Sequence, residues 1–145
     1  MNSTDELLKL DPSQHCNTRM IWEKVFREDT KDFLDYYYNN IAVKNQMYVM
    51  KRESEMISML HLNPYPVFMN GELSLIHYIV AVATLEEYRK QGIMGKLLRT
   101  SLNDMYDRKE IFTYLMPAAE AIYSPYNFVT VYEQLHYKYE GNISL

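Results

Sequence analysis

Cysteine is nearly missing from this chain of 145 residues. The one cysteine, Cys16, cannot form a disulfide within the chain, and no motif for metal binding or nucleophilic catalysis surrounds it. We therefore interpret Cys16 as an incidental thiol. Because the chain can form no internal disulfide, it fits a reducing compartment, and we predict a cytoplasmic location.

Long hydrophobic runs are missing too, since no apolar stretch reaches the roughly 20 residues that span a bilayer. The first residues, MNSTDELLKLD, lack the basic and apolar pattern of a secretory signal. Positive charge is not in excess either, because the net charge is −4. Binding to nucleic acid depends on clustered Lys and Arg. We therefore expect neither a membrane nor a nucleic acid as a partner.

Metal-binding and hydrolase motifs are missing as well. The histidines are widely scattered and none has a partner at the spacing that a zinc site needs, so we predict no metal. Two of them, His61 and His77, lie in strand-like patterns, where we interpret them as structural. The sequence also contains no GxSxG, P-loop or GxGxxG motif.

What is present is an ordinary globular composition, 48% apolar and 23% charged. Because no linker or internal repeat divides the chain, we predict a single domain over residues 1–145. Thr18 is a candidate N-cap for a helix over residues 18–28, and Thr30 or Asp29 is one for a helix over residues 30–40. Helical spacing of apolar residues predicts helices over residues 18–28, 30–40, 93–108 and 118–124. Strand patterns cover residues 46–51, 55–62, 67–69, 72–84, 111–116 and 128–140.

These elements predict a mixed α/β fold of the α+β class. Asn70-Gly71 is a strong signal for a hairpin turn, and NPYP (63–66) predicts a turn or bulge, so the middle strands should be antiparallel. The strand-helix-strand unit over residues 72–116 should be a right-handed crossover that joins parallel strands. We therefore predict a central, mostly antiparallel sheet with one parallel crossover and flanking helices. Ligands in such sheets bind beyond the carboxyl ends of the strands.

Residues 82–95, VATLEEYRKQGIMG, are the most informative stretch of the chain. A buried strand runs into an Arg-x-x-Gly turn, and the turn opens an amphipathic helix. The first N–H groups of a helix are unpaired and its dipole adds partial positive charge, so an anion is stabilised there. Gly92 lets the backbone turn tightly and lets a bulky anion approach. No acid lies between Tyr88 and Arg99. The stretch therefore predicts a cradle for a phosphorylated cofactor.

A second informative segment, AAEAIYSPYNF (118–128), lies downstream. With YRKQGIMGKLL (88–98), it makes the chain resemble the GCN5-related N-acetyltransferase (GNAT) superfamily. The order and spacing of the two segments fit, and the matching helix-strand plan covers about residues 18–140. The closer resemblance is to the N-terminal acetyltransferase domain of Eis-like (enhanced intracellular survival) proteins, which share loops of the VAT–YR–x–x–G–x–M type and an AEAIY-type segment.

The resemblance implies a GNAT-type sheet, acetyl-coenzyme A (acetyl-CoA) as co-substrate and a role for Tyr123 as the proton donor to the departing thiolate. A phenol suits that role because its ordinary pKa near 10 lies above that of a thiol. Arg89 would support the loop or the phosphates. Backbone groups that would pair with the pantetheine arm belong to Val82, Ala83 and Thr84. Amides that would hold the pyrophosphate belong to Lys90, Gln91, Gly92, Ile93, Met94 and Gly95.

Several features depart from the family pattern. Met94 stands where Gly or Ala is usual, and Met116 replaces a common Asn. Asn127 replaces a Gly, although Asn tolerates a left-handed backbone well. Glu86 stands where Pro is common. Eis-like proteins are also much longer, and their carboxyl terminus is thought to reach the active site as a base, whereas this sequence ends at Leu145.

The predicted function is N-acetyltransferase activity by direct attack of a primary amine, small-molecule or peptide, on acetyl-CoA. Glu120 is a candidate base by its position in the sequence. The acidic N-terminal helices and Tyr36–Tyr38 either form an amine-binding wall or simply pack as amphipathic helices. An edge strand at 128–140 would allow a homo-oligomer. The alternatives are a non-catalytic CoA-binding or regulatory module, motivated by Met116 and Asn127, and an α+β protein without a nucleotide ligand.

Overall fold

The computed structural model describes residues 4–138, 140 and 141. Its residues divide into two compact units, one up to Leu115 and the other from Met116 onward. The second unit holds a short helix, α4 (Glu120–Tyr123), and a 3-10 turn, η3 (Ser124–Tyr126). The longer elements all lie in the first unit.

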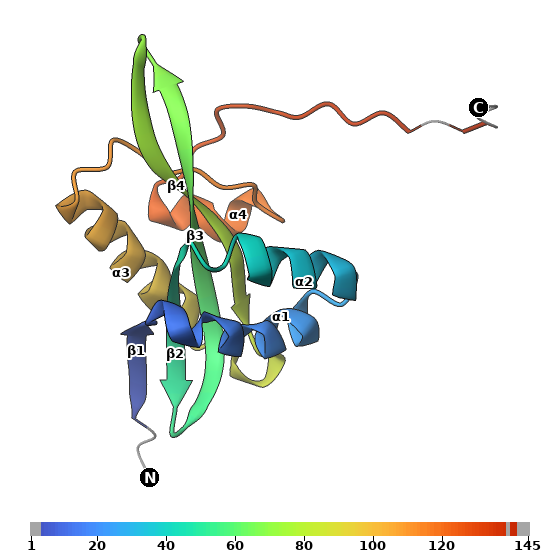
Figure 1. Cartoon of the computed structure of the whole chain (residues 1–145), viewed down its shortest axis with the longest axis vertical. Coiled ribbons are helices and arrows are strands. Elements are labelled where there is room, and N and C mark those ends of the chain that lie inside the picture. The colour runs from blue at the N-terminus through green and yellow to red at the C-terminus, as the bar shows by residue number, and fades with distance from the viewer. Residues whose placement is uncertain (1–3, 139, 142–145) are drawn as a thin grey trace. The chain divides into compact units, whose positions relative to one another are not determined.

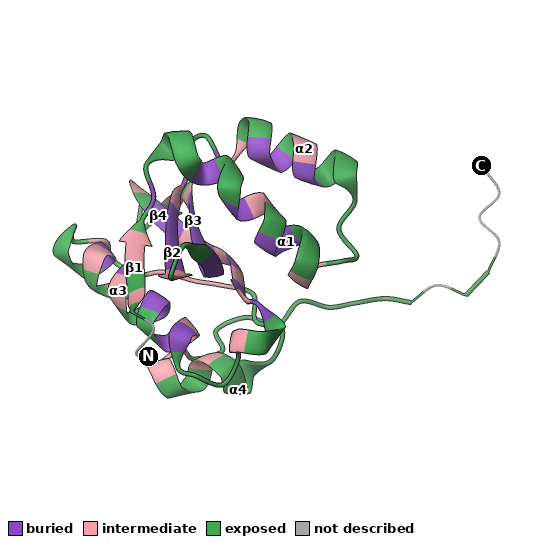
Figure 2. Ribbon diagram, turned by 90° about the horizontal axis from the view of Figure 1, so that it is seen from below, coloured by how far each residue is buried: buried purple, intermediate pink, exposed green. Residues whose placement is uncertain are grey.

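The first unit is built on one antiparallel sheet in the order β1-β2-β3-β4. Helices cover both of its faces, α1 and α2 on one face and α3 on the other (Figures 1 and 2). The strands are β1 (Asp5–Lys9), β2 (Gln46–Arg52), β3 (Glu55–Met69) and β4 (Glu72–Thr84). The helices are η1 (Pro12–Thr18), α1 (Arg19–Val25), α2 (Lys31–Asn40), η2 (Glu86–Tyr88) and α3 (Ile93–Asp107). This arrangement confirms a mixed fold with an antiparallel sheet.

The core follows from the alternation of side chains along the central strands. Met47, Val49 and Met59 face α1 and α2, where they join one apolar cluster with Trp22. The intervening side chains point to the opposite face, and Tyr48 there donates a hydrogen bond from its hydroxyl to Asp104 Oδ2 of α3 at 2.7 Å. Since both faces are covered, β2 and the first half of β3 are buried almost throughout.

Several local predictions are confirmed. The predicted helix at 30–40 is α2, and Thr30 caps it, since its hydroxyl oxygen accepts a hydrogen bond from Phe33 N at 3.2 Å. The predicted helix at 93–108 is α3. The hairpin turn lies at Asn70-Gly71, where both residues have the positive φ of a type I′ turn, 50° and 81°.

The predicted break at NPYP (63–66) is wrong, because β3 runs through it without interruption to Met69. β2 pairs with β3 only as far as Leu62, whereas β3 stays paired with β4 to its end. Pro64 and Pro66 therefore lie where one edge of β3 has no neighbouring strand and needs no N–H donor. The separately predicted strands at 55–62 and 67–69 are halves of this single strand.

The N-terminal region holds a strand that the sequence analysis missed. β1 pairs antiparallel with β2, and its five residues carry no turn signal or strong alternation that would have marked it. Thr18 was a candidate N-cap for the first helix, but its side chain makes no capping bond. Its buried hydroxyl instead donates to His15 O at 2.8 Å and lies 2.8 Å from Tyr38 Oη.

Two other predicted strands do not form in the described residues. Of residues 111–116, only Tyr114 pairs with the sheet, through a single parallel bridge to Tyr78. The bridge agrees with a parallel crossover, but the handedness of that crossover stays a prediction. Residues 128–138 and 140 form no strand either, and Tyr139 lies outside the described residues. The homo-oligomer that rested on a strand at 128–140 loses that basis.

Candidate active site

The site begins at a bulge near the end of β4. Met59 of β3 pairs with Ala83, but His61 pairs with Val80, so β4 contains one residue more than β3 over this interval. The extra residue is accommodated at Ala81, which has a φ of 52°. A bulge bends its strand and increases the local twist. The last residues of β4 therefore follow a different course from the rest of the strand.

After the bulge, β4 has one residue whose N–H and C=O groups face its open edge, the edge that lies away from β3. Ala83 and Leu85 face β3, because Ala83 O accepts a hydrogen bond from Ser58 Oγ at 2.8 Å and Leu85 N donates to Ile57 O at 2.9 Å. Backbone groups alternate between the two edges of a strand. Those of Val82 and Thr84 therefore face away from β3.

The backbone groups of Thr84 and Val82 differ in their hydrogen-bond partners on that edge. The carbonyl of Thr84 accepts a hydrogen bond from Arg89 Nε at 3.1 Å. Val82 has no ladder partner in the described part of the sheet. Val82 therefore presents an N–H and a C=O that an extended ligand can pair with, as an added strand would.

The turn after η2 forms a concave backbone at the start of α3. Lys90 and Gly92 both have a positive φ, 61° and 75°. Successive residues that alternate between left- and right-handed conformations direct their N–H groups toward one point, which makes an anion-binding nest. The first intrahelical bond runs from Lys96 N to Gly92 O at 3.2 Å. The N–H groups of the first turn, Ile93, Met94 and Gly95, receive no side-chain cap.

Basic residues occur in this turn and in the first part of α3. Lys90, Lys96 and Arg99 are exposed. The predicted roles of Arg89 are support of the loop or of the phosphates. The hydrogen bond from Arg89 Nε to Thr84 O agrees with support of the loop, because it attaches the turn to the end of β4. Gln91 is exposed, Met94 is half-buried and Gly95 is buried in the helix. The arrangement can hold an anionic group at a helix N-terminus next to an open strand edge.

Tyr123 lies in the second unit, at the last residue of α4, and is half-buried. Its ring packs against Phe128 in a T-shaped contact with centroids 5.9 Å apart. Asn127 ends the 3-10 turn with a φ of 66°, the left-handed conformation expected where the family has Gly. Glu120, the candidate base, is exposed, and its Oε1 accepts a hydrogen bond from Thr130 Oγ1 at 2.8 Å. Met116 is 68% exposed.

The predicted wall of three tyrosines on α2 is divided. Tyr37 and Tyr38 are buried in the core, so for them the packing interpretation holds, whereas Tyr36 is 60% exposed. Burial raises the pKa of Tyr38 to about 12. Only Tyr36 is left to meet a ligand at this surface.

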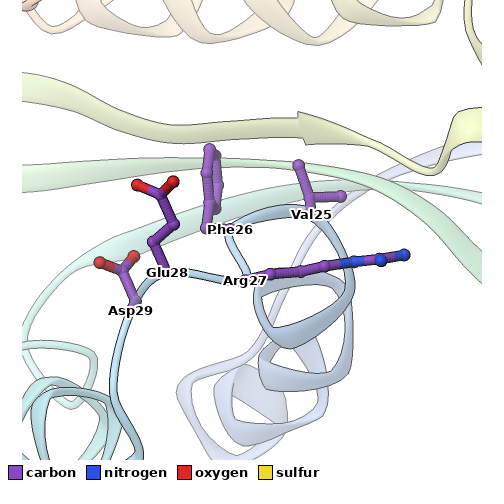
Figure 3. A pocket seen from close by; sticks show the side chains of 5 residues that line it. All are labelled: Val25, Phe26, Arg27, Glu28 and Asp29. Carbon is purple, nitrogen blue, oxygen red and sulfur yellow. The ribbon is translucent and has the colours of Figure 1, made fainter.

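The loop between α1 and α2 lines a hollow of about 380 Å³, which the sequence analysis did not predict. Figure 3 shows Glu28 and Asp29 pointing to the same side of this loop as Phe26. Arg27 also lines the hollow, and its Nε donates to Lys24 O at 3.2 Å, while Asp29 Oδ2 accepts from Trp22 Nε1 at 2.7 Å. The lining thus has two carboxylates and one guanidinium, so its net charge is negative. The run FREDT shows the charge in the sequence, but not the cavity.

Other sequence predictions concern residues outside this region. Cys16 is exposed and free. His61 and His77 are buried within β3 and β4, as their strand-like patterns predicted. No helix in the described chain is long and apolar enough to cross a membrane.

A bulged strand with an open edge, followed by a backbone cradle at a helix start, defines a fold that can bind an extended ligand with an anionic group. The chain belongs to the acetyltransferase (GNAT) domain family, whose sequence model matches residues 9–131. No curated protein matches the sequence significantly.

Solved structures with the same fold agree with this assignment. One is a conserved protein of unknown function from Enterococcus faecalis V583, described as a probable N-acyltransferase; it is 19% identical with a TM-score of 0.78. The match covers 86% of this chain but 32% of that protein, so this chain spans about a third of its length.

Two other structures match along nearly their whole length. The aminoglycoside N-acetyltransferase AAC(6')-Iy in complex with CoA is 10% identical with a TM-score of 0.75, and the match covers 96% of this chain and 97% of that one. A predicted acetyltransferase with acetyl-CoA from Clostridium acetobutylicum is 16% identical with a TM-score of 0.74, covering 93% and 96%. At such identities the likeness shows the fold.

Proposed function

We propose that this domain is an acetyl-CoA-dependent N-acetyltransferase that acts on a primary amine. One observation carries the proposal: the open edge of β4 at Val82 is followed, after the turn that Arg89 fastens, by the unpaired N–H groups at the start of α3. Acetyl-CoA carries an amide-containing arm and a pyrophosphate in sequence. An open strand edge suits the arm, and a helix N-terminus suits the pyrophosphate.

The proposal divides the cofactor contacts among backbone and side chains. The arm would lie along Val82–Thr84, with Val82 making the main pair, because Ala83 faces β3 and Thr84 O already accepts from Arg89. The amides of residues 90–95 would hold the pyrophosphate. Lys90 and Lys96, both exposed, would offset its charge.

Direct attack needs few groups from the protein. A neutral amine attacks the thioester carbonyl carbon, so a C–N bond forms as the C–S bond breaks. The amine nitrogen loses its proton to a base or to solvent, and the CoA thiolate takes a proton from the Tyr123 hydroxyl. Tyr123 then regains a proton from solvent. Glu120 stays the candidate base on its position in the sequence.

For the acceptor, we infer a cationic amine that approaches the hollow beside Glu28 and Asp29. The two carboxylates would attract an ammonium group that is not the reacting one, and Phe26 would contact its carbon chain. Aminoglycosides and polyamines have this chemistry, and AAC(6')-Iy of similar fold is an aminoglycoside N-acetyltransferase. The Eis-like resemblance and the cytoplasmic location stay predictions.

Binding is tested first, because the catalytic function and the CoA-binding module both require it. Acetyl-CoA at 100 times its dissociation constant should stabilise the protein by about 2.7 kcal/mol, seen as a rise in melting temperature. No shift at millimolar acetyl-CoA would support an α+β protein without a nucleotide ligand. Release of free CoA thiol is then measured with aminoglycosides, polyamines, lysine and a peptide N-terminus. Binding without thiol release would favour the non-catalytic module.

Tyr123→Phe tests the proposed proton donor. We expect turnover to fall roughly 10²–10⁴-fold with little change in acetyl-CoA binding, because the phenol acts only as the thiolate leaves. Tyr132→Phe is the matched control, since Tyr132 is a tyrosine of the same unit and is 80% exposed. Equal turnover in both variants, under conditions where chemistry limits the rate, removes Tyr123 from this role.

A further inference from the structure

The end of α3 carries a buried pair of side chains outside the cofactor cradle. His77 Nδ1, from β4, is hydrogen-bonded to Glu110 Oε1. The two side chains are only 8% and 10% exposed. Arg108 Nη2 lies 3.6 Å from the same carboxylate oxygen, and Gln46 Nε2 lies 3.5 Å from His77 Nε2. A buried carboxylate at this position needs such partners, because an unpaired one is costly to desolvate.

The geometry of the helix end places Glu110 in this pair. Lys109 has a φ of 60°, and its N–H donates to Tyr106 O at 2.9 Å. The N–H of Glu110 donates to Met105 O at 3.0 Å. These two bonds form a Schellman motif, which reverses the chain after α3. The reversal directs residues 110–114 back along β4.

Further contacts join these residues to the same short part of β4. Thr113 Oγ1 donates to His77 O at 2.8 Å, and Ile79 N donates to Tyr114 O at 3.0 Å. The rings of Tyr78 and Tyr114 lie 5.0 Å apart. All the described attachments of residues 110–114 to β4 thus lie between His77 and Ile79.

The bulge follows directly after these attachments. Ala81, with its φ of 52°, lies two residues beyond Ile79, and Val82 presents its backbone to the open edge one residue later. The contacts of residues 110–114 with β4 end at Ile79, and the open edge of β4 therefore begins beyond that residue. A shift of residues 110–114 along β4 would cover or uncover Val82.

We propose that His77 and Glu110 are positioning residues for acetyl-CoA, a role that rests on the proposed function. The pair fixes residues 110–114 against His77–Ile79, so the two segments separate in front of Val82 and leave room for the pantetheine arm. Neither side chain contacts the cofactor. The pair acts through the backbone that it holds in place.

Glu110→Gln tests the proposal, because it keeps the shape of the side chain and removes the charge. We expect the KM and the Kd for acetyl-CoA to rise roughly tenfold, with kcat within about twofold. Asp5→Asn is the matched control. Asp5 is 19% exposed and pairs with Arg52 through Oδ1 at 2.7 Å, at the opposite edge of the sheet. A purely structural role would lower the melting temperature of both variants and leave KM unchanged in both.

A double variant separates positioning from independent effects. His77→Gln combined with Glu110→Gln should raise KM no further than Glu110→Gln alone, because either change breaks the same pair. Additive effects, or an unchanged KM in a folded Glu110→Gln protein, overturn the proposal. If Glu110→Gln does not fold, Thr113→Val removes one attachment only and should raise KM roughly threefold. An unchanged KM in a folded Thr113→Val protein then overturns the proposal as well.

Failure of this inference and failure of the proposed function look different. A wild-type protein that does not bind acetyl-CoA refutes the function itself. A wild-type protein that binds it, with a Glu110→Gln variant that binds equally well, refutes only the positioning role.

Discussion

His61 lies at the centre of a buried polar cluster between β3 and α2. Its Nδ1 is 2.9 Å from Tyr37 Oη, which in turn donates to Asn63 Oδ1 at 3.2 Å. Asn45 Nδ2 donates to both of these partners, at 3.3 and 3.0 Å. Trp22 packs edge-on against the imidazole at 5.6 Å. Full burial lowers the pKa of His61 from 6.5 to about 3.

This residue makes stability depend on pH. In the unfolded chain the imidazole binds a proton below pH 6.5, whereas in the folded protein it binds one only near pH 3. Between these values the unfolded state binds more protons, so the free energy of unfolding falls as the pH falls, by up to about 1.4 kcal/mol per pH unit. Urea unfolding measured from pH 6.5 to pH 4.5 should show this slope.

Two variants isolate the effect. His61→Gln keeps polar atoms in the cluster and should flatten the slope, whereas His136→Gln, at an exposed histidine, should not. At lower pH, carboxylates determine how the free energy of unfolding changes with pH. The Arg52 hydrogen bond holds the pKa of Asp5 below 3.8, and the Lys31 and Arg19 hydrogen bonds do so for Asp35. Their stabilisation is present above pH 3.8 and is lost only below it. An unchanged slope above pH 4.5 in His61→Gln would contradict the prediction.

At the scale of elements, the backbone cradle and the His77–Glu110 pair lie at opposite ends of α3. Its N-terminus provides the uncapped N–H groups, and its C-terminus provides the Schellman motif that places Glu110. The two ends differ in how well their residues suit them. Gly92 adopts a positive φ without strain, whereas Lys109 has a side chain at a φ of 60°.

Lys109→Gly should therefore stabilise the protein by about 1 kcal/mol, because Gly removes the strain of the left-handed conformation. The free energy of unfolding in urea is the measurement, with Lys109→Ala as control. Alanine keeps the strain and should bring no gain. A glycine variant no more stable than the alanine variant would show that Lys109 is not strained.

Local signals predicted the elements that depend on local chemistry. The Thr30 cap, the Asn70-Gly71 turn and the apolar stripe of α3 all lie where the sequence indicates. Elements that depend on neighbours were predicted less well. The prolines of β3 were interpreted as a break because nothing in the sequence shows that the pairing of β3 with β2 stops at Leu62. Ala81 gives no sign that it will occupy a bulge.

At the scale of the whole molecule, the chain divides at Leu115 into a sheet-and-helix unit and a second unit. In the first, β3 and β4 pair from Ser58 and Thr84 to Met69 and Glu72, with one irregularity at the bulge. In the second, residues 129–138 have strand-like alternation but are exposed and form no strand. Their apolar side chains include Val131, 86% exposed, and Leu135, 79% exposed.

Hydrogen exchange should separate these two parts. We expect peptides from β3 and β4 to exchange orders of magnitude more slowly than peptides from residues 129–138, because backbone amides exchange slowly when they are paired and buried. Mass spectrometry of deuterated peptides is the measurement, and α3 is the protected reference. Slow exchange in residues 129–138 would instead support the strand that the alternation predicted.

Local sequence patterns specify the helices with strong apolar periodicity, the hairpin at Asn70-Gly71 and the tight turn that opens α3. These depend on short-range rules of spacing, capping and backbone freedom. Tertiary structure decided where β4 bulges, that Val82 faces an open edge, and that His77 meets Glu110. Those features arise because strand register and chain reversal bring distant residues together, and no local pattern records that register.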